Sequence, residues 1–350
     1  MSVTSLTVLI GTYNRAALLR ETLAALQAMT PPRDCTVDIL VVDNNSTDGT
    51  AAAVRDDSGG RRFPVTYLFE PAQGKSFALN AGLSRAAGDI IALTDDDVLP
   101  AHDWAARIVE AFRRSDASFV FGKVLPRWER TPPPELLTER AQAIWGPLAI
   151  VDYGDTTLDY RPDSHGQRLP IGANLSIRRS ALVAIGGWRT DLGKVNNTLI
   201  AGEDHEIFTR LRRHGLYRGI YDPGIVVRHH VPGSRLTRRY FRRWFYWHGK
   251  TRALMLHELY PEVDFARTRT VAGVPRFLYR QTLEQCLRYV RTLGRRDALA
   301  VLHEELHTIQ HAGLLLECWR RHWRERTRGR RPGPSLAGPS WETEARSHDR

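Results

Sequence analysis

The sequence predicts an α/β fold, in which a mostly parallel sheet is flanked by helices and a basic helical region is appended at the C-terminus. Apolar runs alternate with helical patterns over residues 1–125, which is the rhythm of βαβ units. The runs are apolar at almost every position, as in parallel strands that are covered on both faces. Arginine is concentrated after residue 230, and this sets the C-terminal region apart.

The sheet is expected to begin with strands near residues 6–10, 37–42, 65–69, 89–94 and 118–124, with helices between them. The first strand is followed by apolar residues at helical spacing, namely Leu18, Leu19, Leu23 and Leu26. Consecutive prolines interrupt the pattern within residues 127–134. We therefore expect a connector there between two halves, residues 1–125 and 126–232.

The C-terminal region, residues 233–326, is expected to be helical and basic. Residues 236–257 have helical periodicity and are crowded with arginines and aromatic residues. Such a helix either lies flat in a membrane interface, with its arginines on phosphates, or packs on the preceding domain with its arginines outward. Leucines at helical spacing predict a second, docked helix over residues 295–319. The composition of residues 327–350, rich in Gly, Pro and Arg, predicts disorder.

Composition limits the class of protein. The 350 residues can form one large domain with an appendage, and the hydrophobic fraction of 42% is ordinary for a globular protein. No apolar run approaches the roughly 18 to 20 residues that span a bilayer, and the first strand follows the N-terminus without a signal-peptide pattern. The cysteines Cys35, Cys286 and Cys318 lack metal-ligand spacing. A cytoplasmic location is therefore expected.

The net charge of +11 lies entirely in the C-terminal part of the chain. Residues 1–230 hold 26 Lys and Arg against 27 Asp and Glu, a net charge of −1, whereas residues 231–350 hold 24 against 12, a net charge of +12. A near-neutral domain joined to a basic appendage indicates contact with an anionic surface, either lipid head groups or nucleic acid.

The most informative segment is residues 88–97, an apolar strand that ends in the consecutive carboxylates Asp95, Asp96 and Asp97. Carboxylate oxygens suit Mg²⁺ or Mn²⁺, and these ions commonly accompany the phosphates of a substrate. Open α/β sheets also bind their ligands at the carboxyl ends of strands. An isolated Asp triplet is equally consistent with a solvated turn, so its neighbours decide the interpretation.

Three further segments precede the triplet in the chain. They are Thr-Tyr-Asn-Arg at residues 12–15, Val-Asp-Asn-Asn-Ser-Thr-Asp-Gly-Thr at residues 42–50, and a Gly-Lys…Leu-Asn-Ala-Gly helix at residues 74–82. With the triplet, they resemble the motifs of the inverting family 2 glycosyltransferases over roughly residues 5–250, and an ordered series is more specific than one match. The resemblance implies a Rossmann-like GT-A fold, with residues 1–125 binding a nucleotide-sugar and residues 126–232 facing the acceptor.

The resemblance also implies roles for residues near the donor. Asp97 is the strongest candidate ligand for a divalent cation, Mn²⁺ or Mg²⁺. Asp95 and Asp96 are expected near the ribose and diphosphate, although the triplet leaves the register open, so that Asp95 is a second candidate metal ligand. Lys75 is expected to contact the diphosphate, with a solvated surface lysine as the alternative. Asn80, in the same Gly-Lys helix, is also expected on the donor side.

Further donor contacts are expected at the ends of the first two strands. Asp43 would lie against the nucleotide base, with Thr12 and Tyr13 beside it and the Tyr13 ring available to pack on the base. Alternatively, Asp43 makes an Asx turn that caps the next helix.

The general base is expected in an acidic turn that opens an amphipathic helix at residues 202–211. By resemblance Asp204 is the base and Glu203 helps to position the acceptor. The like charges of Glu203, Asp204 and Glu206 would raise one another's pKa, which favours base catalysis. Alternatively, these acids simply favour a helix N-terminus through its dipole.

The acceptor is expected near residues 172–179 and 185–188, which match the segment that the family places beneath the donor sugar. Gly187 would permit close backbone approach, and Trp188 would offer its ring to a sugar, unless it is a core tryptophan.

A Pro-x-x-x-Val-x-His pattern makes His229 a further candidate ligand of the metal or diphosphate, with the adjacent His230 as a competing choice.

Together, the residues predict a metal-dependent inverting glycosyltransferase that transfers a sugar from a nucleotide diphosphate to an acceptor hydroxyl. The expected acceptor is a carbohydrate or a lipid-linked sugar, in the synthesis of a surface polysaccharide or glycolipid at the inner face of the membrane, and nucleic acid is not an expected partner. Two alternatives are a nucleic-acid-binding protein with a basic arm and a non-catalytic α/β domain, and a nucleotidyltransferase.

Overall fold

A computed structural model describes residues 3–56, 60–161, 169–195 and 198–327. Over these residues, nine strands form one sheet in the order β3-β2-β1-β4-β8-β6-β9-β5, with β7 also paired to β9. The strands are β1 (Ser5–Thr12), β2 (Thr36–Asp43), β3 (Val65–Phe69), β4 (Ile90–Asp95), β5 (Val98–Pro100), β6 (Phe119–Trp128), β7 (Leu158–Tyr160), β8 (Leu175–Arg178) and β9 (Gly219–Val231). All five strands expected in the first 125 residues are confirmed.

The sheet has a parallel part and a mixed part. Strands β1 to β4 are parallel, whereas β8 is antiparallel to both β4 and β6, and β9 is parallel to β6 but antiparallel to β5 and β7. Because β6 runs through residue 125, the two halves expected from the sequence share this one sheet. The short strands β5, β7 and β8 were not anticipated, since three or four residues carry little periodicity.

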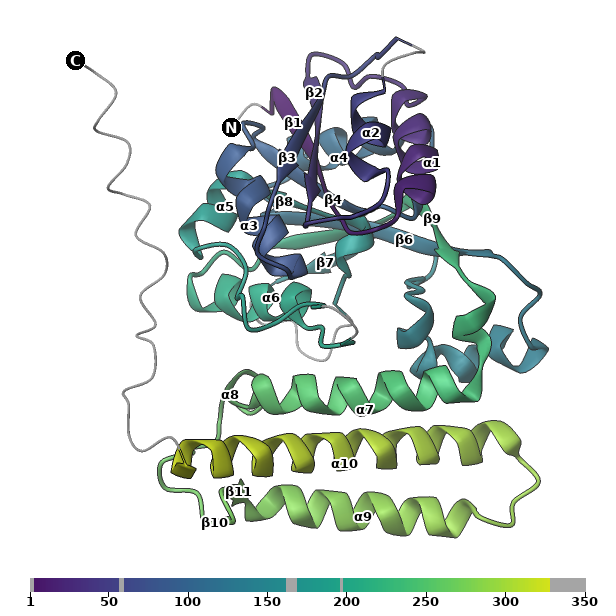
Figure 1. Ribbon diagram of the computed structural model, residues 1–350, viewed down its shortest axis with the longest axis vertical. Helices are drawn as coiled ribbons and strands as arrows, with labels where there is room; N and C mark the ends of the chain where they lie inside the picture. Colours follow the sequence, from purple (N-terminus) through teal and green to yellow (C-terminus); the bar gives the residue numbers. More distant parts are fainter. Residues whose placement is uncertain (1–2, 57–59, 162–168, 196–197, 328–350) are drawn as a thin grey trace.

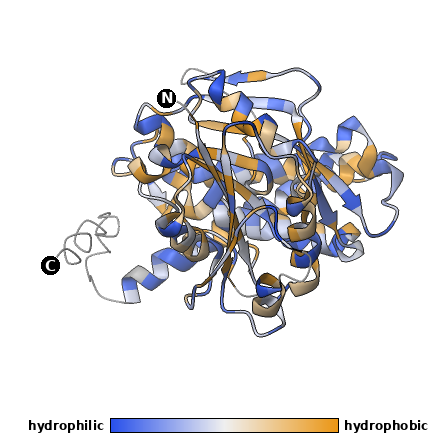
Figure 2. Ribbon diagram, turned by 90° about the horizontal axis from the view of Figure 1, so that it is seen from above, coloured by the Kyte–Doolittle hydropathy of each residue, from blue (hydrophilic) through white to orange (hydrophobic). Residues whose placement is uncertain are grey.

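Helices cover the sheet and extend the chain beyond it (Figure 1). They are α1 (Ala16–Gln27), α2 (Thr50–Arg55), α3 (Lys75–Arg85), α4 (Trp104–Arg113), α5 (Arg179–Ala184), α6 (Glu203–Arg213), α7 (Arg238–Leu254), α8 (Leu256–Leu259), α9 (Arg276–Thr292) and α10 (Ala298–Thr327). Consecutive residues of β1, β2 and β4 are buried, so both faces of these strands are covered. Apolar residues accordingly concentrate in the central strands (Figure 2).

The C-terminal helices are stacked beneath the sheet domain, with α7 nearest to it, α10 in the middle and α9 outermost (Figure 1). The α7 and α10 backbones approach closely at two glycines. A Cβ added at Gly249 would lie 2.0 Å from the backbone oxygen of Gln310, and one at Gly313 would lie 2.2 Å from that of Tyr246. The two helices therefore depend on the absence of side chains at these positions.

The position of α7 decides between the two alternatives raised for residues 236–257. Phe241 and Phe245 are buried in a core with residues of the 134–148 segment, and no aromatic ring of α7 is more than partly exposed. Arg238 and Arg242 form ion pairs with Glu305 on α10. The helix therefore packs on the domain, and its rings are not available to a membrane interface as the first alternative required.

The rest of the C-terminal region was predicted in part. The helix expected over residues 295–319 is α10, which docks as expected, whereas α9 lies in the region expected to be helical but was not predicted as a separate helix. No helix among the described residues is both long enough and apolar enough to cross a membrane. The expectation of disorder for residues 327–350 falls almost wholly outside the described residues, since α10 ends at Thr327.

Candidate active site

The candidate site lies at the edge of the sheet where β1, β2 and β4 end. Thr12 is paired with Asp43 across β1 and β2, and Gly11 is paired with Asp95 across β1 and β4. Three of the segments singled out in the sequence therefore meet at one edge, as the carboxyl ends of parallel strands must.

The acidic triplet is divided between a strand and a turn. Asp95 ends β4, while Asp96 and Asp97 form the turn into β5. Because β5 pairs with β9, Val98 lies opposite His229, and this register brings His229 Nε2 to 3.5 Å from Asp97 Oδ1. The His229 side chain is buried at 3% exposure, and the adjacent His230 donates its backbone N–H to the Asp97 carbonyl at 2.9 Å. The structure therefore places the side chain of His229 beside the Asp97 carboxylate, whereas His230 contacts Asp97 through its backbone.

An arginine that sequence analysis left without a role neutralises the turn. Arg15 Nη1 donates to Asp96 Oδ1 at 2.9 Å and to Asp97 Oδ2 at 2.7 Å. Thr12, expected to contact the donor, donates its hydroxyl to Asp96 Oδ2 at 2.8 Å. Burial raises the pKa of Asp96 to about 6 even though Arg15 opposes the shift. Arg15 closes the Thr-Tyr-Asn-Arg segment, and that motif was the signal available for it in the sequence.

Lys75 joins the acidic triplet to the acidic helix start. Its ammonium group lies 3.2 Å from Asp95 Oδ1 and 3.5 Å from Glu203 Oε1. Burial lowers the pKa of Lys75, but Asp95, Asp204 and Glu203 more than offset this, so the pKa is raised well above its usual value. The pKa of Asp95 is lowered by Lys75 despite burial. Lys75 is therefore a fixed cation inside the site, and the alternative of a solvated surface lysine does not hold.

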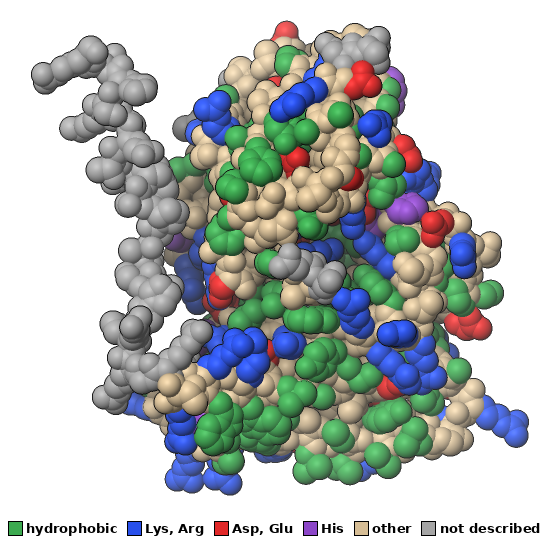
Figure 3. All heavy atoms as spheres, in the orientation of Figure 1, with side chains coloured by type: hydrophobic (Ala, Val, Ile, Leu, Met, Phe, Trp, Pro, Cys, Tyr) green, Lys and Arg blue, Asp and Glu red, His purple; other side chains and the backbone are tan. Residues whose placement is uncertain are grey.

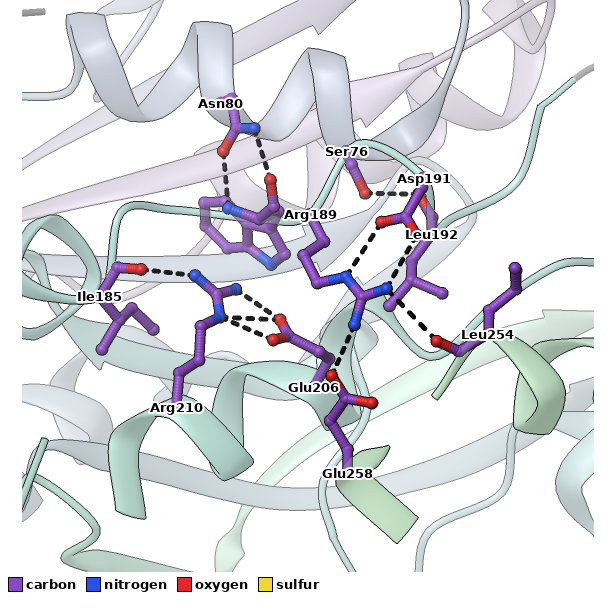
Figure 4. A network of polar contacts seen from close by, with 11 residues as sticks. Ser76, Asn80, Ile185, Arg189, Asp191, Leu192, Glu206, Arg210, Leu254 and Glu258 are labelled. Atoms are coloured by element: carbon purple, nitrogen blue, oxygen red, sulfur yellow. Dashed lines mark hydrogen bonds and ion pairs between the residues drawn. The ribbon is translucent and has the colours of Figure 1, made fainter. Parts of the chain in front are cut away.

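The carboxylate of Asp204, the proposed base, is held through one of its two oxygens. The backbone N–H of Gly172 donates to Asp204 Oδ2 at 2.8 Å, while Oδ1 is buried without a hydrogen-bond partner among the residues that the structure describes. Burial, and then the charge of Asp204, raise the pKa of Glu203. The carboxylate of Glu206 is engaged by Arg210, whose Nε donates to its two oxygens at 2.8 and 2.9 Å (Figure 4).

The residues expected at the nucleotide base have different environments. Asp43 is 2% exposed, and its two oxygens accept hydrogen bonds from the Ser46 N–H at 2.9 Å and the Tyr67 hydroxyl at 2.8 Å. Asp43 does not cap the next helix, because the N-cap of α2 is Gly49 and has no side-chain cap hydrogen bond, so its place near the nucleotide base stays a prediction. Tyr13 is 41% exposed at the end of β1, so its ring remains available for stacking.

Asn80 and Trp188 differ from the roles expected of them. The Asn80 amide donates to the Trp188 carbonyl and accepts from the Trp188 N–H, both at 2.8 Å. Gly187 is required beside this clamp, because a Cβ there would lie 2.5 Å from Asn80 Oδ1. Trp188 is 3% exposed within the main core. The structure therefore favours a core tryptophan over an acceptor platform, and Asn80 positions this segment instead of facing the donor.

The donor atoms at the turn suit a divalent cation. Asp97 Oδ1 is buried and lacks a hydrogen-bond partner among the described residues, and it faces an imidazole nitrogen 3.5 Å away. No cluster of three or more His, Cys, Asp or Glu side chains within the described ranges could enclose a metal ion. Asp97, with His229 beside it, could nevertheless hold Mg²⁺ or Mn²⁺, since Mg²⁺ is commonly bound through one or two carboxylates, with substrate phosphates and water completing the shell.

Comparisons with known proteins bear on the family of this chain. A family model described as glycosyl transferase family 2 matches residues 7–186. The chain is 24% identical over 227 residues to the glucosyl-dolichyl phosphate glucuronosyltransferase of Haloferax volcanii, covering 65% of this chain and 69% of that protein. It is 29% identical over 231 residues to the validoxylamine A glucosyltransferase of Streptomyces hygroscopicus subsp. jinggangensis, covering 60% of this chain and 52% of that protein.

Two solved structures are similar in fold. The mannosyltransferase PcManGT from Pyrobaculum calidifontis, in complex with GDP-Man and Mn²⁺, aligns with a TM-score of 0.55 at 21% identity, covering 91% of this chain and 87% of that chain. The S. aureus protein TarS, in complex with UDP, aligns with a TM-score of 0.50 at 13% identity, covering 95% of each chain. These likenesses confirm the GT-A type of α/β fold that the sequence predicts.

Proposed function

The chain belongs to glycosyl transferase family 2, and from this premise we propose that it transfers a sugar from a nucleotide diphosphate to an acceptor hydroxyl with inversion at the anomeric carbon. The family assignment replaces the two alternatives, a non-catalytic nucleic-acid-binding protein and a nucleotidyltransferase. The observation that carries the proposal is the environment of Asp204, in which one oxygen is fixed by the Gly172 N–H at 2.8 Å and the other has no partner among the described residues.

In the proposed reaction, Asp204 accepts the proton of the acceptor hydroxyl while the oxygen attacks the anomeric carbon. The bond from that carbon to the diphosphate breaks, and the diphosphate leaves with the electron pair. A single displacement inverts the anomeric carbon, so an α-linked donor gives a β-linked product without a covalent enzyme intermediate. Glu203, held by Lys75 at 3.5 Å, borders the same space and would help to orient the acceptor.

The negative charge of the leaving diphosphate would be neutralised by a lysine side chain and a divalent cation. Lys75 lies between Asp95 and Glu203, which raise its pKa above the usual value, so it would present a positive charge to the leaving phosphate. Asp97 and His229 would hold a divalent cation, Mn²⁺ or Mg²⁺, which when bound supplies further charge neutralisation for the leaving diphosphate. Arg15 keeps Asp96 and Asp97 in place through two short ion pairs.

The names of the related proteins guide the choice of substrates. The two similar structures contain GDP-Man and UDP, and one relative is named for a glucosyl-dolichyl phosphate acceptor. We therefore propose a UDP- or GDP-sugar as donor and a carbohydrate or lipid-linked sugar as acceptor, in the synthesis of a surface polysaccharide or glycolipid at the cytoplasmic face of a membrane.

The proposal is tested by Asp204→Asn, which keeps the shape of the side chain and an acceptor for the Gly172 N–H. The rate of nucleotide release from the donor, measured in the presence of an extract that contains the acceptor, should fall by about 10²- to 10⁴-fold. The affinity for the donor should change less than about threefold. Asp155→Asn, at an exposed carboxylate, is the matched control. The anomeric configuration of the product, read by NMR, should be opposite to that of the donor. A retained configuration, or full activity of Asp204→Asn, would overturn the proposal.

A further inference from the structure

The outermost helix, α9, carries an apolar stripe on its solvent side. Leu283, Leu287 and Val290 are 61%, 46% and 59% exposed, and Leu293 just beyond the helix is 52% exposed. Large apolar side chains at such exposure are unremarkable when scattered singly, but a contiguous row indicates a surface that is covered by something else.

Helical geometry shows that this row is separate from the packing face of α9. The spacings of four and three residues place Leu283, Leu287 and Val290 on one side of the helix. The opposite side contacts α10, since Leu278 is buried in a core with α10 residues and Gln285 donates its amide to Glu304 at 2.9 Å. The stripe therefore points away from the rest of the described molecule.

The stripe is bordered by positive charge. Residues 269–296 contain seven arginines and one acid, Glu284, a net charge of +6. All seven arginines are exposed: Arg269, Arg276, Arg280, Arg288, Arg291, Arg295 and Arg296. Arg276, Arg291, Arg295 and Arg296 have no carboxylate partner among the residues that the structure describes. Apolar and basic side chains accordingly lie together along the lower edge of the molecule, where α9 and α10 are located (Figure 3).

Charge distinguishes the candidate occupants of this face. A second copy of the chain would bring two faces of net charge +6 together with a single glutamate on each, so repulsion opposes that pairing. An anionic lipid surface is complementary to this face in charge and in hydrophobicity. Its phosphates would contact the arginines, and its acyl region would accommodate the leucines. The helix is also the outermost layer, so such contact leaves the catalytic edge of the sheet uncovered (Figure 1).

We propose that the outer face of α9, built on Leu283, Leu287 and Val290 with their flanking arginines, docks this protein on an anionic lipid bilayer. The helix lies parallel to the membrane plane, with the three apolar side chains below the head groups and the arginines at phosphate level. This surface differs from α7, whose aromatic side chains are packed against the domain and α10. The inference does not depend on which sugar the enzyme transfers.

The test is flotation of the full chain with vesicles of phosphatidylcholine alone and of phosphatidylcholine with about one third phosphatidylglycerol. The protein should float with the anionic vesicles, and Leu287→Asp should reduce its partition coefficient about tenfold. Leu137→Asp, at a residue that is 57% exposed outside α9, is the matched control and should not change partitioning. The pair Arg276→Gln and Arg291→Gln should weaken binding to the anionic vesicles by about fivefold for each charge removed.

Several outcomes would overturn the proposal. One such outcome is that the wild-type chain remains in the aqueous fraction with both kinds of vesicle. Another is that Leu287→Asp partitions to the same extent as Leu137→Asp. Light scattering tests the other candidate occupant, a second copy of the chain. If the wild type is a dimer that does not bind vesicles, and Leu287→Asp is a monomer, the stripe is a dimer interface. Thermal melting should show all variants folded, because each substituted side chain is exposed.

Discussion

The close approach of Gly172 to Asp204 provides a sensitive test of the proposed base. An added Cβ at Gly172 would lie 2.8 Å from Asp204 Oδ1 and 3.0 Å from Oδ2. Ordinary carbon–oxygen contacts begin near 3.4 Å, so Gly172→Ala must displace the carboxylate by about 0.5 Å, or lengthen the 2.8 Å hydrogen bond that fixes it. A misplacement of about 1 Å can cost about 10²-fold in rate.

We therefore expect Gly172→Ala to lower kcat by about 10- to 100-fold, equivalent to about 1.4 to 2.7 kcal/mol of transition-state stabilisation. The KM for the donor should change little, because the methyl group meets the base and not the acidic triplet. The assay is steady-state nucleotide release at saturating donor. Gly49→Ala is the control, since its φ of −73° suits alanine and its nearest neighbours are 3.9 Å away.

The reasoning would be refuted if folded Gly172→Ala retained kcat within about twofold of the wild type. That result would mean that the position of the Asp204 carboxylate does not limit the rate, so the base would have to be sought elsewhere.

Three further predictions concern stability. Arg15→Gln should lower the free energy of unfolding by about 2 kcal/mol in urea titrations, a figure reduced from that of a fully buried pair because the Arg15 side chain is 40% exposed. Gly313→Ala should cost about 3 kcal/mol by the same measurement, since its Cβ would lie 2.2 Å from the backbone oxygen of Tyr246, and a loss below about 1 kcal/mol would refute the close packing of α7 and α10. Burial lowers the pKa of His248 to about 3, so the unfolded state binds a proton first as the pH falls below 6.5, and about 2 kcal/mol of stability should be lost between pH 7 and pH 5. His248→Gln should be less sensitive to this acidification.

Much of the sheet could be predicted because its strands are continuous apolar runs. The first five expected strands appear at their expected places, and the polar residues that follow β1, β2 and β4 meet at one edge by the rule for parallel strands. The choice between His229 and His230 could not be made from the sequence. It follows from the pairing of Val98 with His229, a contact between residues 131 positions apart, and sequence periodicity does not encode such a register.

Other side chains were misjudged because a distant partner determines their environment. Trp188 is buried where Asn80, 108 residues earlier, holds its backbone with two hydrogen bonds. No role was predicted for Arg15, although it belongs to the Thr-Tyr-Asn-Arg motif. Its role becomes visible in the folded turn, where its guanidinium group reaches the carboxylates of Asp96 and Asp97. The helix α9 lies in the region expected to be helical, but it was not predicted as a separate helix although Leu283 and Leu287 have helical spacing, since the surrounding arginines obscure its apolar face.

The central claim is that Asp97 and His229 form a cation-dependent site for a nucleotide-sugar. It is tested most directly by calorimetric titration with UDP-, GDP- and dTDP-sugars, with and without Mn²⁺, on the wild type, Asp97→Ala and the control Asp155→Asn. We predict that one donor binds in the presence of Mn²⁺ and that Asp97→Ala weakens this binding at least tenfold while Asp155→Asn does not. Failure of every donor to bind, or binding that is indifferent to both Mn²⁺ and Asp97, would contradict the account.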